Sequence, residues 1–236
     1  MVEGVRLLEE AQHKGWMPEL VLYCDSLTKR GLNLVRSYQD SGIAVEQVTA
    51  QVLRAASDTE SPQGLLAVLP FNELPLPPAP TFILILDALR DPGNLGTILR
   101  TAAAAAVEAV LLTPGTVDAF ASKVVRSGMG AHFHLPIRSL QWAEIKDYLG
   151  LANPDRTLKM YLADAGAGLS YTRADFRSPA ALIIGGEAEG AGDEARRWND
   201  ERVHIPLPGQ MESLNAGIAA GILLFEVVRQ RNLTRS

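Results

Sequence analysis

Cysteine is almost absent from this 236-residue sequence, in which Cys24 is the only one. An intrachain disulfide is therefore excluded, and the default expectation is a reducing, cytoplasmic setting. The four histidines are scattered along the chain, and no group of His, Asp or Glu accompanies the single thiol. A structural zinc site needs several grouped ligands, so the sequence predicts a protein without a bound metal.

Long apolar runs are also lacking. The longest, Ala216 to Val228, is interrupted by Gly217, Gly221 and Glu226 and falls short of the roughly 20 apolar residues that span a membrane. The start at Met1-Val2-Glu3-Gly4 has no basic, apolar leader pattern, and its abruptness is what trimming of a longer amino terminus would leave. The balance of 47% hydrophobic and 21% charged residues is typical of a globular protein.

A positive net charge is missing as well, because the formal net charge is −5. Nucleic-acid phosphates need local positive potential, so the overall charge does not favour such a partner. Residues 119–143 differ, since they contain Lys123, Arg126 and Arg138 and no acidic residue. This strip is either a contact for RNA phosphates or a solvated surface, and charge alone favours the second interpretation.

Prolines mark one boundary in the chain. Residues 72–81 hold four prolines within six positions, from Pro75 to Pro80. Such a segment forms neither a helix nor a central strand, and it favours an extended, semi-rigid spacer. We therefore expect a first domain over residues 1–71, a linker over 72–81 and a second domain over 82–236.

The first domain alternates helical and strand patterns, which predicts a small α/β sandwich. Through Pro75 it carries six basic and ten acidic residues, so most of the net negative charge lies here. The expected helices are Glu3–Lys14 and Thr28–Gln39, and the expected strands are Leu20–Cys24, Ala44–Val48 and Leu65–Leu69.

The second domain repeats the alternation with more apolar strands. Continuous apolar strands separated by helices indicate an α/β fold with a mostly parallel sheet and helices on both faces. In such sheets, ligands bind beyond the carboxyl ends of the strands. The expected strands are Phe82–Leu86, Ala109–Leu112, Met160–Ala163, Ala181–Ile184 and Val203–Ile205, and the expected helices are Leu95–Ala106, Ala119–Gly128, Trp142–Leu149, Asp193–Asn199 and Ala216–Gln230.

The first of three notable loops, Asp91-Pro92-Gly93-Asn94, follows the first of these strands. It has the chemistry of a strand-to-helix turn, in which Asn94 is able to cap the following helix. That interpretation leaves Arg100 unexplained. If the helix opens after Asn94, a cation so near its amino terminus opposes the helix dipole, so we expect an anionic ligand nearby.

The second and third loops follow later strands. The second, Gly185-Gly186-Glu187 to Gly190, is rich in glycine and permits close backbone approach to a ligand. It is not a dinucleotide-binding or phosphate-loop motif, and taken alone it favours the interpretation as a plain loop. The third runs from Ile205-Pro206 to Asn215, where Ser213 or Asn215 is able to cap the last helix. The Ala/Gly-rich start of that helix suits close packing within the chain or between subunits.

Together and in this order, the three loops resemble the motifs of the SpoU (TrmH-type) branch of the SPOUT RNA methyltransferases. The match covers residues 82 to 231 almost without gaps, and the first domain resembles the ribosomal-protein-like domain that often precedes this catalytic domain. The matching segments are Asp91-Pro92-Gly93-Asn94-Leu95-Gly96 with Arg100-Thr101-Ala102, Ile184-Gly185-Gly186-Glu187 with Gly190, Ile205-Pro206 with Ser213-Leu214-Asn215, and, more weakly, Lys123 to Ala131.

The resemblance implies a fold with a carboxyl-terminal trefoil knot, a homodimer and S-adenosylmethionine as the methyl donor. The implied donor-binding residues are Gly185, Gly186, Glu187, Gly190, Ile205, Leu207, Ser213, Leu214 and Asn215. The implied catalytic set is Arg100 with Asn94, Glu187, Ser213 and Asn215, and Lys123 and Arg126 are the expected RNA contacts.

The implied activity is methylation of a ribose 2′-hydroxyl in RNA, with ribosomal RNA favoured by the separate first domain. A guanidinium stays charged and is a poor base, so we interpret Arg100 as a clamp on phosphate and on the developing alkoxide. Three alternatives remain: a tRNA 2′-O-methyltransferase, a non-catalytic RNA-binding assembly factor on the same fold, and an unrelated α/β nucleotide-binding enzyme.

Overall fold

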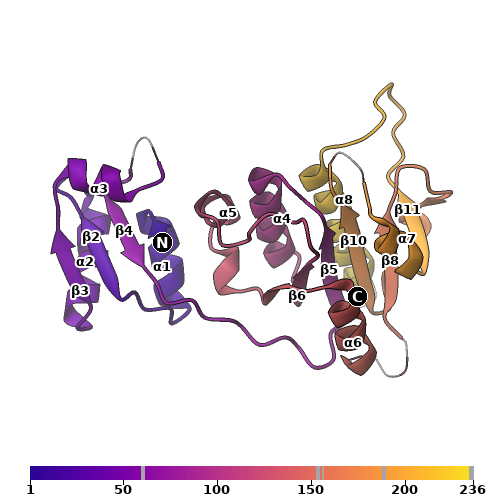
Figure 1. Ribbon diagram of the computed structural model, residues 1–236, viewed down its shortest axis with the longest axis horizontal. Coiled ribbons are helices and arrows are strands. Elements are labelled where there is room, and N and C mark those ends of the chain that lie inside the picture. Colours follow the sequence, from indigo (N-terminus) through magenta and orange to yellow (C-terminus); the bar gives the residue numbers. More distant parts are fainter. Residues whose placement is uncertain (60–61, 153–154, 156, 188–189, 234–236) are drawn as a thin grey trace.

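Two β-sheets lie on either side of the proline-rich segment in the computed structural model, which describes residues 1–59, 62–152, 155, 157–187 and 190–233. Figure 1 shows the smaller sheet with the amino terminus at one end of the molecule and the larger sheet at the other. An extended segment without helix or strand connects them. No helix of the described residues is both long and apolar enough to cross a membrane.

The first sheet has four strands in the order β1 (Val2–Glu3), β4 (Leu65–Val68), β2 (Leu20–Tyr23) and β3 (Ala44–Gln47). Only the β2–β3 pair is parallel. Helices α1 (Val5–His13) and α2 (Lys29–Asp40) pack on one face, and α3 (Ala50–Ala56) packs on the other. The sequence pattern therefore predicted the α/β sandwich but missed α3 and β1.

The first helix begins later than the predicted Glu3. Val2 and Glu3 pair with Ala67 and Leu66 as strand β1. Gly4 follows in a left-handed conformation with φ of 99°, which ends the strand before the helix begins at Val5. A pairing partner more than sixty residues away thus overrode the local helical pattern.

The proline-rich segment is extended, and it is docked onto the second domain. Arg138 donates to the carbonyl oxygen of Leu74 at 2.6 Å, and the Tyr148 hydroxyl donates to the carbonyl of Pro77 at 2.8 Å. The domains also touch directly, because Nε2 of His134 in the second domain lies 2.6 Å from Oε1 of Glu10 in the first. The segment is therefore fixed on the second domain, and the first domain contacts the second through side chains outside the segment.

The second sheet has seven strands, and every pair in it is parallel. The five predicted strands lie within one or two residues of their expected bounds, and the two further strands are short ones at the edges. The order is β7 (Ile137–Ser139), β6 (Ala109–Leu112), β5 (Phe82–Asp87), β10 (Ala180–Gly185), β8 (Lys159–Ala163), β11 (Glu201–His204) and β9 (Leu169–Ser170).

Helices cover both faces of this sheet, as predicted. Leu84 and Leu86 of β5 pack in one apolar cluster with α4 (Pro92–Ala104), α5 (Ser122–Gly128) and α8 (Ala216–Leu233). The alternate residues Ile83 and Ile85 pack in a second cluster with α6 (Trp142–Ala152) and α7 (Asp193–Trp198). Two short 3₁₀ helices, η1 (Ala131–Phe133) and η2 (Tyr171–Arg173), complete the described elements. The trefoil knot stays a prediction.

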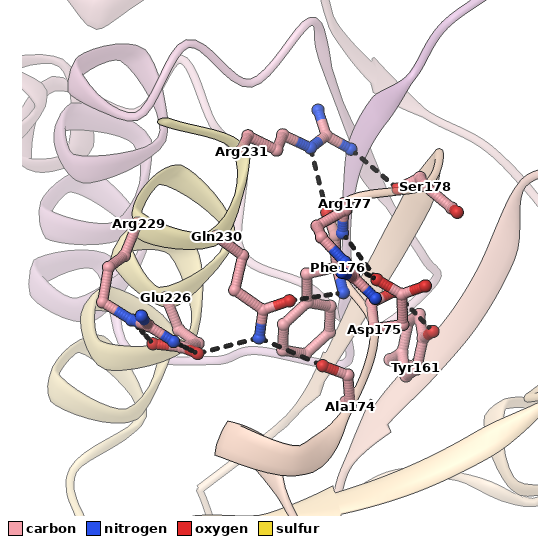
Figure 2. A network of polar contacts seen from close by, with 10 residues as sticks. All are labelled: Tyr161, Ala174, Asp175, Phe176, Arg177, Ser178, Glu226, Arg229, Gln230 and Arg231. Atoms are coloured by element: carbon pink, nitrogen blue, oxygen red, sulfur yellow. Dashed lines mark hydrogen bonds and ion pairs between the residues drawn. The ribbon is translucent and has the colours of Figure 1, made fainter. Parts of the chain in front are cut away.

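The last helix is held at its carboxyl-terminal end by buried polar groups (Figure 2). The Gln230 amide donates to the Ala174 carbonyl at 3.0 Å and to Glu226 at 2.8 Å, and it accepts from the Phe176 amide at 2.9 Å. Arg231 donates to the Phe176 carbonyl at 3.1 Å. Buried polar groups are costly to leave unpaired. These bonds therefore fix how far α8 can shift along its axis relative to the sheet, and in this way they position its amino terminus.

Candidate functional site

Three strands deliver the predicted loops to one edge of the second sheet. β5, β10 and β11 are parallel and end at Asp87, Gly185 and His204, so their following loops meet at the carboxyl edge. A pocket of about 620 Å³ lies there. All nine residues of the predicted donor-binding set line it. The size suits a cofactor-sized ligand, for which pockets of about 300–1,000 Å³ are usual.

Several other pocket-lining residues were not predicted. Ala163 ends β8 and Ala165 lies in the turn after it, and Glu212, Ala216 and Ala219 come from the third loop and the first turn of α8. The turn after β8 reads Asp-Ala-Gly-Ala-Gly over residues 164–168. Small residues directly after a parallel strand were the available signal, and the order β10-β8-β11 places that turn between two of the predicted loops.

The described ends of the second loop, residues 185–187 and 190–192, are bridged to each other and are called the glycine hairpin here; Gly185 and Gly186 in it have no room for a side chain. Gly186 and Gly190 exchange backbone hydrogen bonds of 3.1 Å in both directions. A Cβ added at Gly185 would lie 2.3 Å from the Ala191 nitrogen, and one at Gly186 would lie 2.5 Å from the Ala88 oxygen. Glycine at these two positions is therefore required because the loop packs closely on itself and on the turn at Ala88. As a result, this wall of the pocket consists mainly of backbone.

A chain of polar side chains links all three loops. Asn215 caps α8, because its Oδ1 accepts from the amides of Gly217 and Ile218 at 2.9 and 3.2 Å. Its Nδ2 must then donate, and it does so to Asn94 Oδ1 at 2.9 Å. Asn94 in turn donates from Nδ2 to Glu187 Oε1 at 2.8 Å. Both amide orientations follow from this sequence of donors and acceptors.

Glu187 is a hydrogen-bond acceptor in this chain. Burial raises its pKa, but hydrogen bonds from Asn94 and from the backbone of Glu187, Arg90 and Asp91 outweigh that effect, so the net shift of the pKa is downward. The carboxylate is therefore charged at neutral pH. It suits the role of orienting Asn94 and does not suit that of a proton donor.

The prediction that Asn94 caps the helix following the loop was wrong. Asp91 is the cap, since its Oδ1 accepts from the Asn94 amide at 2.7 Å, and Pro92 occupies the first helical position. Helix α4 therefore begins at Pro92, and Asn94 lies within its first turn, which frees its side chain for the contacts with Asn215 and Glu187.

The earlier start of α4 also corrects the argument about Arg100. Arg100 is the ninth of thirteen helical residues, so it lies beyond the first turn, in which the helix dipole would disfavour a cation. The electrostatic reason for expecting an anion beside it was wrong. Its side chain is exposed and forms no hydrogen bond or ion pair in the described part of the chain.

Arg100 also lies apart from the other predicted catalytic residues. It is six residues beyond Asn94, which is about 9 Å along a helix and on another face. It does not line the 620 Å³ pocket but a separate concavity of about 240 Å³, beside Glu10, Met129 and His134. Within one chain, Asn94, Glu187 and Asn215 are joined by hydrogen bonds, Ser213 lines the same pocket as Glu187 and Asn215, and Arg100 contacts none of them.

The predicted RNA contacts, Lys123 and Arg126, lie on α5. Lys123 is exposed, whereas Arg126 is half-buried in a narrow gap beside Glu3 and Asp58 of the first domain. The third basic residue of the strip, Arg138, is engaged by the linker and by Glu73 at 3.3 Å. Among the described residues there is no group of three or more His, Cys, Asp or Glu side chains placed to hold a metal ion.

Two family models match the chain. Residues 81–225 match the SpoU rRNA Methylase family, and residues 1–67 match the MRM3-like substrate binding domain.

Individual relatives agree with these matches. The 23S rRNA (guanosine(2553)-2′-O)-methyltransferase RlmP of Bacillus subtilis (strain 168) is 34% identical over 96% of this chain and 87% of its own length. The mitochondrial rRNA methyltransferase 3 of Homo sapiens is 31% identical over 98% of this chain and 67% of its own. The crystal structure of the SpoU methyltransferase AviRb from Streptomyces viridochromogenes with AdoMet has a TM-score of 0.88 and 28% identity, covering 98% of this chain and 90% of that one.

Proposed function

Because this chain belongs to the SpoU rRNA methylase family, we propose that it transfers a methyl group from S-adenosylmethionine to a ribose 2′-hydroxyl of ribosomal RNA. The observation that carries the proposal is the 620 Å³ pocket at the carboxyl edge of the sheet, which all nine predicted donor-binding residues line. Relatives named as 23S rRNA 2′-O-methyltransferases support ribosomal RNA as the substrate.

The residues of the pocket fit the proposed donor. Ile184, Ile205 and Leu207 offer apolar surface for an adenine ring. The backbone of the glycine hairpin permits close approach to a ribose and to a charged amino-acid end. Glu187 adds a negative charge to the pocket. Such a charge suits a donor that carries a positive sulfonium, and a ligand without a positive charge would not need it. Structures of AdoMet-bound relatives support the same donor.

The chain contributes positioning and electrostatics to the proposed reaction. Bound donor supplies an electrophilic methyl group, so the protein has to align a 2′-hydroxyl behind it and stabilise the oxygen as it loses its proton. Asn94 and Asn215 each keep a second amide hydrogen beyond the bond that orients them. These hydrogens and the Ser213 hydroxyl are the groups that we assign to the hydroxyl and the donor.

A homodimer is the second part of the proposal. Gly217 and Gly221 of α8 face Thr97 and Thr101 of α4, so the small-residue face of α8 serves packing within the chain. The face of α8 that is turned away from the buried core is not covered by any described residue, and on it Ile218 is 56% and Phe225 48% exposed. We propose that a second copy covers this face, as the family resemblance implies.

The dimer also gives Arg100 a role. Its neighbour Thr101 packs against α8, so a second copy seated on α8 comes close to the free guanidinium. Arg100 then acts on RNA phosphate or on the reacting oxygen at the interface, although it lies outside the donor pocket of its own chain. Its exposed charge, which has no partner among the described residues, supports this assignment.

The function is tested by binding and by transfer. Calorimetry should detect S-adenosylmethionine binding and no NAD binding, and labelled methyl should pass to ribosomal RNA in preference to tRNA. Mapping 2′-O-methyl sites in cells with and without the gene should show the loss of at least one ribosomal site. Donor binding without any loss of a site would favour the non-catalytic assembly factor, and preferential labelling of tRNA would favour the tRNA alternative.

The dimer is tested by light scattering at micromolar concentration. The wild type should have twice its chain mass of 25.4 kDa. Phe225→Glu should produce a monomer, whereas Met211→Glu, at a 74% exposed apolar side chain outside the α8 face, should leave the dimer intact. A wild-type monomer that is fully active would refute the assignment of Arg100 to the interface.

A further inference from the structure

Asp87 is a buried carboxylate at the carboxyl end of β5, and no predicted role includes it. Its side chain is 4% exposed. It does not line the donor pocket. Three donors converge on it. The Thr113 hydroxyl reaches Oδ1 at 2.7 Å, the Trp142 indole N–H reaches Oδ1 at 3.2 Å, and the Gly192 amide reaches Oδ2 at 2.7 Å.

These three donors come from three different parts of the second domain. Thr113 follows β6, Trp142 begins α6, and Gly192 ends the glycine hairpin at the start of α7. No Lys, Arg or His forms an ion pair with Asp87 in the described ranges. A buried carboxylate without a cation is costly unless hydrogen bonds replace its lost water. We therefore expect these hydrogen bonds to hold another part of the fold in place.

The element that these bonds organise is the hairpin that forms one wall of the donor pocket. In the parallel pairing of β10 with β5, Gly185 lies opposite Asp87, so the backbone of Asp87 is beside the start of the hairpin. Its side chain holds Gly192, at the end of the hairpin. One residue therefore fixes both ends of the segment whose Gly185, Gly186, Glu187 and Gly190 line the pocket.

We propose that Asp87 is a positioning residue for S-adenosylmethionine: through the bond to the Gly192 amide it holds the glycine hairpin in the shape that binds the donor. This inference rests on the proposed function, since it assigns a determinant of donor affinity in the same pocket. Asp87 touches neither donor nor RNA, so its effect should fall on donor binding and not on the methyl-transfer step.

Asp87→Asn separates the hairpin contact from the other two. The Asn oxygen has reason to stay at the Oδ1 position, where it accepts from both Thr113 and Trp142. The new NH₂ group then faces the Gly192 N–H, and two donors oppose each other. Donor dissociation constant and donor KM should rise by about tenfold or more, the size expected for one hydrogen bond to a charged group. The kcat at saturating donor should stay within about threefold.

Trp142→Phe is the matched control, because it removes one donor to Oδ1 and leaves the Gly192 bond in place. Trp142→Phe should lower the Tm by about as much as Asp87→Asn does, and it should change donor affinity less than about twofold. Gly192→Pro is the second variant, for the case that Asp87→Asn does not fold. The φ of −71° is one that proline adopts, but the ring carbon replaces the hydrogen that points at Asp87 Oδ2, 2.7 Å from the nitrogen. The variant therefore breaks the same contact by displacing the carboxylate, and it should weaken donor binding at least as much.

The outcomes are distinct. Weakened donor binding in Asp87→Asn or Gly192→Pro, with faster exchange of the hairpin amides and unchanged binding in Trp142→Phe, supports the inference. Wild-type affinity in either hairpin variant, or equal weakening in Trp142→Phe at matched Tm, overturns it while the proposed function stands. A wild type that binds no S-adenosylmethionine overturns both.

Discussion

Replacing Arg100 by Ala is the substitution that separates folding from chemistry most cleanly. The side chain is exposed and makes no polar contact in the described residues. Its loss should therefore change the free energy of unfolding by no more than about 0.5 kcal/mol, as for surface positions in general. Arg100 does not line the donor pocket, so the dissociation constant of S-adenosylmethionine should not change.

Methyl transfer should respond very differently. Removing one preorganised donor that stabilises developing charge costs about a hundredfold to a thousandfold in rate, which corresponds to about 2.7–4 kcal/mol of activation free energy. Arg100→Lys should recover only part of this, because an ammonium lacks the planar fork that holds two oxygens together. The assay is single-turnover transfer of labelled methyl to ribosomal RNA at saturating donor.

Arg173→Ala is the control for loss of charge in the same domain, since Arg173 lies on η2, is exposed and forms no polar contact among the described residues. It should methylate at the wild-type rate. Full rescue by Lys would reduce the role of Arg100 to simple charge. An Arg100→Ala protein with wild-type transfer, or one that loses donor binding, would refute this reasoning.

Three further predictions concern the hairpin, the last helix and the basic strip. Gly185→Ala should weaken donor binding at least tenfold in calorimetry because its Cβ would meet the Ala191 nitrogen at 2.3 Å, whereas Gly209→Ala, with no atom within 4 Å, should bind normally, and a chelator should leave activity unchanged. The sequence alone would suggest that the added carbon collides with the donor. In the structure it collides with the hairpin itself. Glu226 has its pKa lowered below the usual 4.5, chiefly by the hydrogen bond from Arg229 and against the effect of burial; its contribution to stability should be complete above about pH 6 and decline as the pH falls through the lowered pKa, and denaturant unfolding of Glu226→Gln should lack this dependence. Lys123→Ala with Arg126→Ala should flatten the salt dependence of RNA binding by up to about two units of slope, at about 0.7–0.9 per phosphate contact, with Arg173→Ala as the control; an unchanged slope would return the strip to a solvated surface.

Most of the second domain was predictable because its signals are local. Strands such as Phe82–Asp87 and Ala180–Gly185 are continuous apolar runs, and each is followed by turn chemistry. Parallel strands place such turns at one edge. The nine donor-binding residues that the sequence motifs predict therefore line one pocket of the structure. Their roles in binding and catalysis stay predictions.

Apart from the short local helix α3, the errors arose where a partner distant in the sequence decided the outcome. The start of α4 depended on whether Asp91 or Asn94 provided the cap. Asn94 was unavailable, because Asn215 and Glu187, at separations of 121 and 93 residues, engage its side chain. The misplaced start then carried the wrong electrostatic argument for Arg100. Strand β1 and the turn at 164–168 were missed for the same reason, because strand pairing and strand order depend on residues far away in the sequence.

The amino-acid sequence by itself predicted most of the longer elements, the two-part organisation and the family, because apolar periodicity, proline clusters and motif spacing act over a few residues. Only the tertiary structure decided that Arg100 faces away from the donor pocket and that Gly217 and Gly221 serve packing on α4. It alone decided that Asp87 holds a glycine 105 residues away. A hydrogen bond has a range of about 3 Å in space and no preferred range along the chain, so such contacts exist only once the sheet has brought its strand ends together.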